Sequence, residues 1–177
     1  VNISSLDTDK LKKNLPDLEK VLPYDPGITG PLNADIEVNG KTSSLTISKI
    51  DVKASVFDSD VQNFSVSGSF GPLGKDFNTD KAKAELDFET GPVLFEKLRN
   101  FKPLKDKFPQ EIKGSGPLTA SGSINGNISS PDIKSLKIGA TDTDLSYGDI
   151  FRKPEGLEFV INTDTGISED KISLSNS

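Results

Sequence analysis

The side chains of this chain that could do chemistry are mainly carboxylates, and some occur as pairs at alternate positions. These pairs are Asp7 and Asp9, Asp58 and Asp60, and Asp142 and Asp144. Paired carboxylates can bind Ca²⁺, but this ion takes about six to eight oxygen ligands, and neither a Gly-rich loop nor a later Glu completes a binding loop. We therefore expect solvated turns at these positions, with no metal site and no cofactor.

Catalytic groups of other kinds are missing from the sequence. The 177 residues include no Cys, no His and no Met, which excludes Ser-His-Asp catalysis, thiolate chemistry and His-based metal sites. A glycan-processing enzyme would need two opposed carboxylates in a cleft, whereas this sequence offers acids at turns. The segment "SFGPLGKDF" at 69–77 has glycines near a lysine but lacks the spacing of a phosphate-binding loop. We expect no catalytic residues and a non-enzymatic function.

The amino-acid composition limits the kinds of partner that this chain is expected to bind. The formal net charge is −6, and Lys and Arg are scattered without a basic stripe, so we expect no nucleic-acid binding. Hydrophobic residues make up 33 % and aromatic residues 7 % of the chain, which suits a thin structure that buries one face. No apolar run approaches the ~20 residues that span a bilayer. Because the chain opens at Val1 without Met, we expect an excerpt of a longer protein, in which an anchor elsewhere stays open.

One pattern occurs twice in the sequence. The segment "GPLNADIEVNG" at 30–40 is echoed by "GPLTASGSING" at 116–126, a shift of 116 − 30 = 86 residues. The agreement continues without a gap as far as Ala54, which falls on Ala140, and it extends backwards through the preceding helical segments. We therefore predict two repeats, 1–90 and 91–177, the second of them truncated.

Each predicted repeat begins with one short amphipathic helix. Leucines at helical spacing, with acidic capping residues before them, predict the first helix at about 8–22. The segment "GPVLFEKLRNFKPLKDKFP" predicts the second at about 93–108, with Pro103 inside it. A helix with apolar residues along one side is more typical of a helix packed on its own domain than of a helix at a membrane surface.

The rest of the chain alternates apolar and polar residues with period two, which indicates half-buried strands. The alternation changes parity near Ser48 and Lys49, and this change predicts a β-bulge. Asn39-Gly40 and Asn125-Gly126 are predicted to form hairpin turns. Long strands without intervening helices predict a mainly β fold with a curled, mostly antiparallel sheet.

Three stretches resemble one known family. They are "LPDLEKVLPYDPGITGPLNADIEVNG", "FPQEIKGSGPLTASGSINGNISSPDIKSLKIGATDTDLSYGD" and "EGLEFVINTDTGISEDKISLSNS". An amphipathic segment ending in Leu-Pro, then Gly-x-Leu-x-Ala and a series of strands, is similar to the AsmA-like family, which includes AsmA, TamB and YhdP. The likeness spans nearly the whole chain as a pattern of strand lengths and small residues, without a catalytic motif.

The resemblance implies a fold, a function and a location. It implies a β-taco-like sheet whose open apolar groove conducts or shields phospholipid acyl chains between the inner and outer membranes of a Gram-negative bacterium, in support of outer-membrane biogenesis. The chain would then be a periplasmic part of an inner-membrane-anchored protein, with neighbouring repeats and acyl-chain ligands as partners. A closed β-sandwich with a structural or adhesive role is the alternative, because a second sheet would cover the same face equally well.

The expected lining of the groove follows from the strand alternation. The predicted residues are Ile36, Val38, Ile47, Ile50, Val52, Phe64, Val66, Leu86, Phe88, Ile124, Ile133, Ile138 and Phe159. In the second repeat Gly122 stands where the first has Ile36, so we expect the groove to be widest there.

Overall fold

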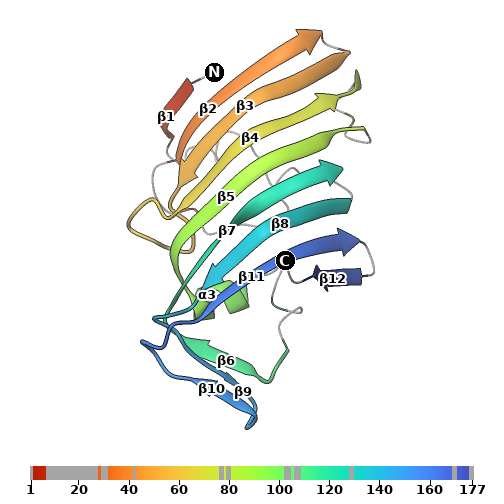
Figure 1. The fold of residues 1–177 in the computed structure, drawn as a ribbon. Coiled ribbons are helices and arrows are strands. Elements are labelled where there is room, and N and C mark those ends of the chain that lie inside the picture. Colours follow the sequence, from red (N-terminus) through yellow and green to blue (C-terminus); the bar gives the residue numbers. More distant parts are fainter. Residues whose placement is uncertain are drawn as a thin grey trace.

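The computed structural model describes residues 2–6, 28, 32–41, 43–75, 78, 81–101, 105, 109–127, 130–168 and 171–175. Within these ranges the chain is mainly β, with two antiparallel sheets and one short helix (Figure 1). The prediction of a mainly β, mostly antiparallel fold is confirmed.

The larger sheet has nine strands in the order β1-β2-β3-β4-β5-β7-β8-β11-β12. It is not closed, because β1 and β12 form its two edges and do not pair with each other. The strands are β1 (Asn2–Leu6), β2 (Leu32–Lys41), β3 (Ser44–Ala54), β4 (Phe64–Leu73), β5 (Lys83–Leu94), β7 (Pro117–Asn127), β8 (Ser130–Gly139), β11 (Val160–Ser168) and β12 (Lys171–Ser175). Figure 1 shows the long strands side by side and curving in one sense.

The smaller sheet has three strands in the order β10-β9-β6 and lies beyond one end of the large sheet (Figure 1). Its strands are β6 (Ile112–Ser115), β9 (Asp144–Tyr147) and β10 (Phe151–Lys153). Leu145 and Tyr147 alternate with polar residues as in the long strands, which predicts a further strand of the same series. The structure places them instead in the separate small sheet, because β9 pairs with β6 and β10.

The strand bounds follow the sequence repeat. A shift of 86 residues carries β2 and β3 onto β7 and β8 to within one residue at every end. The following strands differ: Val66 of β4 pairs with Val52, whereas Ile161 of β11 pairs with Ile138. Because 161 − 66 = 95 and 138 − 52 = 86, the second unit holds nine extra residues, which accommodate the β9–β10 hairpin. The limits of the two repeats, 1–90 and 91–177, stay a prediction.

The predicted bulge is present in β3. Lys49 pairs with Glu37 and Ile47 pairs with Val38, so Ser48 is the extra residue of β3 against β2. On its other side the same segment faces β4, where Gly68 has a φ of +139° and a Cβ would lie 2.0 Å from the Glu85 carbonyl oxygen. Because only glycine tolerates that approach, β4 stays paired with β5 beside the bulge.

The two predicted hairpin turns are misplaced by three residues. Lys41 pairs with Ser44, and Asn127 pairs with Ser130, so Asn39-Gly40 and Asn125-Gly126 lie inside β2 and β7. Gly40 (φ +122°) and Gly126 (φ +100°) instead adopt extended conformations with positive φ near the strand ends. A Cβ on Gly40 would lie 2.2 Å from the Ser44 carbonyl oxygen, so the glycine permits the close approach of the paired strand.

The second predicted helix is shorter than expected. Helix α3 spans Phe95–Asn100, because Gly91 to Leu94 continue β5 in extended conformation. It ends before Phe101, whose backbone is extended, two residues ahead of Pro103, which has no N–H to donate. The Lys105 N–H donates to the Phe101 carbonyl oxygen (2.9 Å). The first predicted helix, at about 8–22, lies outside the described residues.

A dense core lies at one end of the molecule, where residues 55–63, 91–101, 112–117 and 140–156 meet. We call this region the packed end. Its buried residues include Val56, Asn63, Val93, Phe95, Ala140, Thr143 and Lys153, each less than a tenth exposed. Phe57 packs edge-on against Phe101 with 5.3 Å between the ring centroids, and Lys97 forms an ion pair with Asp58.

Candidate functional site

The strand register gathers the predicted lining residues on one face of the large sheet. Directly paired residues of antiparallel strands point to the same side, so each row of partners across the sheet shares a face. One such row is Ile36, Ile50, Gly68, Leu86, Ile124 and Ile133. A neighbouring row is Ala34, Val52, Val66, Phe88 and Gly122. A third row, beside the first, contains Val38, Ile47, Phe70 and Ala84. A fourth row, beside the second, contains Ala54, Phe64, Thr90, Ala120, Ile138 and Ile161.

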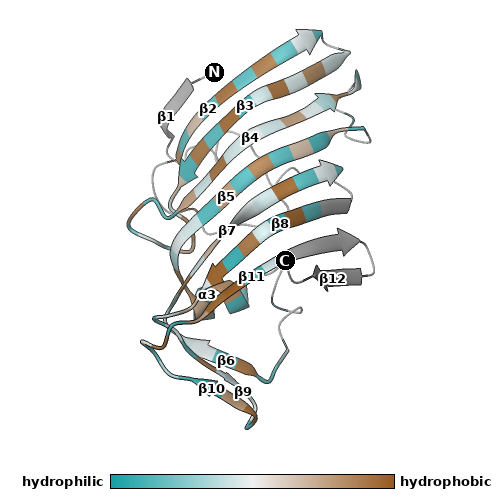
Figure 2. Ribbon diagram, viewed as in Figure 1, coloured by the Kyte–Doolittle hydropathy of each residue, from teal (hydrophilic) through white to brown (hydrophobic). Residues whose placement is uncertain are grey.

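Twelve of the thirteen predicted residues therefore share one face, which we call the apolar face. Figure 2 shows the same alternation as bands of hydrophobic and hydrophilic residues along β2 to β8. The bulge at Ser48 is essential to this arrangement: in a strand without a bulge, Ile47 and Leu45 would point to the opposite side from Ile50, because they stand an odd number of residues from it.

The large side chains of the apolar face are not fully buried. Ile36, Ile50, Val66 and Leu86 are of intermediate exposure, and Val38 is 50 % exposed. Full burial on this face is confined to small or peripheral residues such as Ala34, Ala54 and Ala84. The apolar face therefore retains accessible hydrocarbon surface, whose removal from water would be favourable by about 25 cal/mol per Å².

Gly122 does not open a gap in this face. A Cβ built on Gly122 would lie 3.2 Å from two ring carbons of Phe88, the residue paired with it on β5. The aromatic ring thus covers the glycine, as cross-strand aromatic residues commonly do. The expectation that a groove, if one exists, is wider at Gly122 stays a prediction, although the Phe88 ring fills the space beside this glycine.

Phe159, the thirteenth predicted residue, lies outside the strands. It directly precedes β11, and its ring packs against Phe151 of β10 with 6.1 Å between the centroids. Its carbonyl oxygen accepts a hydrogen bond from the Ala140 N–H (2.9 Å). Phe159 therefore joins the large sheet to the small one, beside the row that contains Ile138.

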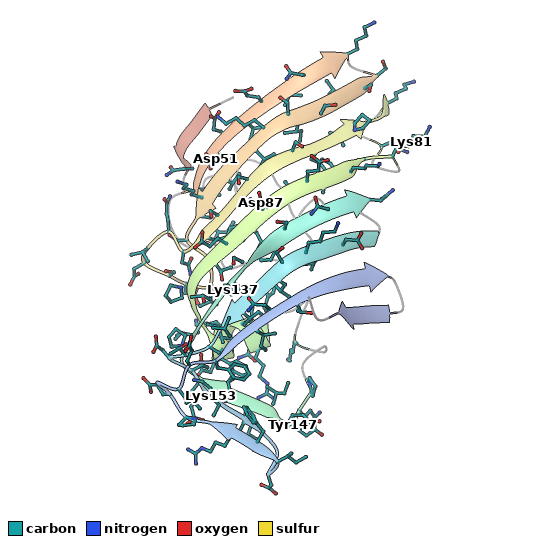
Figure 3. The ribbon with its side chains drawn as sticks, in the orientation of Figure 1. Asp51, Lys81, Asp87, Lys137, Tyr147 and Lys153 are labelled. Atoms are coloured by element: carbon teal, nitrogen blue, oxygen red, sulfur yellow. The ribbon has the colours of Figure 1, made fainter. Side chains whose placement is uncertain are left out.

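The opposite face of the large sheet is polar. Its central strand, β5, presents Glu85, Asp87 and Glu89, and the Ser123 hydroxyl donates to the Asp87 carboxylate (2.5 Å). Figure 3 labels Asp51 on β3 and Asp87 on β5, with β4 between these strands. With charges on one side and aliphatic groups on the other, the sheet is amphipathic across its thickness.

On the polar face, the ion pair of Lys49 with Asp35 shifts the pKa of both groups. The Lys49 ammonium donates to the Asp35 carboxylate at 2.6 Å across β2 and β3. This hydrogen bond lowers the pKa of Asp35 and raises the pKa of Lys49. Both side chains are well exposed, so solvent screening leaves the pair only a small share of stability.

In the packed end, Asn63 binds backbone groups from two segments. Its Oδ1 accepts from the Val56 N–H (2.8 Å), and its Nδ2 donates to the carbonyl oxygens of Val56 (3.2 Å) and Pro92 (3.3 Å). The Gly91 N–H donates to the Asn63 carbonyl oxygen (2.6 Å). Asn63 is 6 % exposed, so these bonds satisfy backbone groups that water does not reach readily.

Lys153 has the corresponding role in the second half of the packed end. Its ammonium donates to the carbonyl oxygens of Thr141 (2.6 Å) and Thr143 (2.7 Å), and the residue is 1 % exposed. Thr143 in turn donates through Oγ1 to the Pro117 carbonyl oxygen (2.5 Å). Lys153 ends β10 and Tyr147 ends β9, and Figure 3 labels both in the small sheet. Sequence reasoning missed both Asn63 and Lys153, because their partners are backbone groups that the tertiary structure brings to them.

The acid pairs do not assemble a metal centre in the part of the chain that the structure describes. Asp58 pairs with Lys97, and Asp144 lies 3.4 Å from Arg152. Asp7 and Asp9 lie outside the described residues. The described ranges also contain no helix that is both long and apolar enough to cross a bilayer.

Comparison with known proteins gives no relative. No family model, no curated protein and no solved structure matches the chain. Any assignment of function therefore depends on the apolar face and on the sequence pattern.

Proposed function

We propose that this chain is a non-enzymatic, AsmA-like segment whose apolar face conducts or shields the acyl chains of phospholipids. The single observation behind this proposal is the arrangement of twelve bulky apolar residues on one side of an open sheet, where they stay only partly buried. In this proposal the sheet forms one wall of a continuous groove that runs through both repeats.

The chemistry of the apolar face fits an acyl chain better than a polar ligand. Its rows are built from Ile, Val, Leu, Phe, Ala and Gly, with Thr90 among the few polar members. A hydrocarbon tail needs neither hydrogen bonds nor a fixed charge, and each buried methylene contributes about 0.8 kcal/mol. The acids of β5 lie on the other face, where they would stay in water.

The location proposed for the chain is the periplasm of a Gram-negative bacterium, as part of a protein anchored in the inner membrane. There the segment would support outer-membrane biogenesis by giving acyl chains a water-shielded path between the two membranes. This part of the proposal depends on the resemblance of the three quoted sequence stretches to the AsmA-like family.

A pair of neighbouring substitutions tests the proposal. Ile50→Lys places a charge on the apolar face, whereas Asp51→Lys introduces the same side chain one residue further on the polar face. The purified chain and both variants would be incubated with phosphatidylethanolamine–phosphatidylglycerol vesicles, separated from them, and examined by native mass spectrometry and lipid extraction. Circular dichroism and thermal unfolding would verify that each variant is folded.

The expected result is bound phospholipid on the unchanged chain and on Asp51→Lys, with at least a tenfold loss on Ile50→Lys, which corresponds to about 1.4 kcal/mol. Photo-crosslinking with a diazirine-bearing phospholipid would then label residues of the apolar face. Absence of phospholipid from the folded chain, or equal binding by the two lysine variants, would contradict the proposal. A face covered by a second sheet about 10 Å away would favour the β-sandwich alternative.

A further inference from the structure

The β9–β10 hairpin carries large apolar side chains at its tip. Ile150 lies in the loop of the hairpin and is 85 % exposed. Tyr147 and Phe151, which pair with each other on either side of this loop, are also exposed. Figure 1 shows the hairpin at one end of the molecule, beyond the large sheet. The three side chains form an exposed apolar patch, which we call the hairpin tip.

Neither the turn nor the large sheet requires an aliphatic residue at the hairpin tip. The Ile150 N–H donates to the Tyr147 carbonyl oxygen (3.1 Å), and Gly148, with a φ of +51°, supplies the left-handed conformation in the loop. Such loops usually carry small or polar residues. The first unit connects β3 to β4 through residues 55–63 without any hairpin. Exposed apolar patches of this kind are typical of binding surfaces.

The charged residues beside the hairpin tip are acidic. Asp149 directly precedes Ile150 in the loop. The Gly148 N–H donates to the Glu111 carbonyl oxygen (3.1 Å), so Glu111 lies beside the same loop. Both acids are exposed, and neither takes part in the ion pairs formed among the described residues. The hairpin tip therefore has carboxylates at its border that are available to a partner.

The basic residues of the small sheet do not offset this charge at the hairpin tip. Lys113, Ser146 and Arg152 form the row of paired residues next to the tip, and adjacent rows point to opposite sides of a sheet. Arg152 also lies 3.4 Å from the Asp144 carboxylate. Lys153 is buried and donates to two backbone carbonyl oxygens. A partner would thus meet mainly carboxylates around the apolar side chains.

A surface hollow of about 470 Å³ opens beside the hairpin tip. Its lining includes Asp144, Ser146, Asp149, Ile150, Phe151 and Arg152. Since Arg152 pairs with Asp144, Asp149 is the lining carboxylate that has no ion partner among the described residues. The hollow therefore has room for a basic side chain directly beside an exposed aliphatic one.

We propose that the hairpin tip docks a segment of another protein chain that presents aliphatic side chains flanked by Lys or Arg. The aliphatic side chains pack on Tyr147, Ile150 and Phe151, and a basic group enters the hollow and pairs with Asp149. Charge complementarity selects this partner over an anionic membrane surface, which the carboxylates repel. The proposal is independent of the binding of acyl chains, because the hairpin tip lies outside the large sheet.

Fluorescence anisotropy with a labelled model peptide tests the proposal on the full chain. The probe is a short peptide that alternates leucine with lysine, and its control carries glutamate in place of lysine. Ile150→Ser and Asp149→Asn change the hairpin tip, and both new residues are common in turns. Val61→Ser and Asp60→Asn are the matched controls. These two residues form the same acidic–aliphatic pair in the first unit, where Val61 is 67 % exposed, but without a hairpin and its aromatic pair.

The leucine–lysine peptide should bind the unchanged chain saturably, and about tenfold more tightly than the leucine–glutamate peptide. Ile150→Ser should weaken binding about tenfold and Asp149→Asn about threefold, because an apolar anchor contributes more than a charge at its border. Val61→Ser and Asp60→Asn should change binding less than about twofold. Amide NMR shifts should move at residues 144–152 on binding, and circular dichroism would verify that each variant is folded.

Three results would overturn the proposal. The first is the absence of saturable binding by the leucine–lysine peptide, or equal binding of the two peptides. The second is a loss of binding in the control variants as large as that in the hairpin variants. The third is flotation of the chain with phosphatidylethanolamine–phosphatidylglycerol vesicles that Ile150→Ser abolishes, which would identify the hairpin tip as a membrane-binding element.

Discussion

The packed end and the apolar face use similar side chains to opposite effect. In the packed end, Val93 is 4 % exposed and Phe95 is 3 % exposed, and the buried side chains of Asn63 and Lys153 are paired with backbone groups. On the apolar face, Val66 and Leu86 remain partly exposed although β4 and β5 are both flanked by paired strands. Stability should therefore depend mainly on the packed end.

In the packed end, the connections that follow β3 and β8 are held by side chains of different kinds. After β3, the chain turns back through residues 55–63 and is held by the neutral amide of Asn63. After β8, at the equivalent point, the chain inserts the β9–β10 hairpin and is held by the charged Lys153. Each side chain satisfies backbone groups of the connection, but the charged one must also be removed from water, which lowers its net contribution.

The largest effect on stability is expected from Asn63→Ala. This change removes three side-chain hydrogen bonds and leaves buried backbone groups of Val56 and Pro92 without those partners. The free energy of unfolding should fall by about 3 kcal/mol, at roughly 1 kcal/mol per bond. Urea denaturation would measure it, with Asn39→Ala, a change at an exposed asparagine, as the control. Equal effects of the two changes would contradict the role of Asn63.

A smaller loss is expected from Lys153→Met, which keeps much of the side-chain volume. The carbonyl oxygens of Thr141 and Thr143 lose their charged donor, but the cost of burying the ammonium also disappears. The expected net loss is about 2 kcal/mol. Lys113→Met, at an exposed position of the small sheet, provides the matched control and should change stability little. A Lys153→Met chain as stable as the unchanged protein would contradict the comparison with Asn63.

A third prediction compares the two regions by making the same change, valine to alanine, in each of them. Val93→Ala removes two methyl groups from the packed end, and Val66→Ala removes the same groups from the apolar face. The first should cost about 2 kcal/mol and the second less than about 1 kcal/mol, because only fully buried groups lose their whole transfer free energy and leave a cavity. Thermal unfolding without lipid would measure both. A greater loss from Val66→Ala would indicate that the apolar face is part of the protein's own core.

The sequence predicted the apolar face better than the packed end. Alternation with period two assigns the side of every strand residue, and the parity change at Ser48 locates the bulge, so twelve of thirteen lining positions share a face. The hairpin turns were misplaced because Gly40 and Gly126 use positive φ within strands instead of between them.

Asn63 and Lys153 were not predictable, because their partners are backbone groups that tertiary structure brings together. The β9–β10 hairpin was also missed. Leu145 and Tyr147 alternate like any strand of the large sheet, and nothing local distinguishes a strand that pairs with β6 from one that extends the long ladder.

The smallest effect is expected on the polar face, from Lys49→Gln. Loss of the ammonium should raise the pKa of Asp35 toward its ordinary value, because the hydrogen bond from Lys49 is the main cause of its lowered pKa. The lowered pKa of Asp35 stabilises the folded chain at neutral pH, and this stabilisation is lost as the pH falls through that pKa. The raised pKa of Lys49 also stabilises the folded chain at neutral pH, and this stabilisation is lost as the pH rises through that pKa. Both groups are exposed, so the unfolding free energies of the variant and the unchanged chain should coincide at pH 7. An NMR titration of the Asp35 carboxyl at low salt would detect the pKa change, and an unchanged Asp35 pKa would show that the Lys49 contact does not persist in solution.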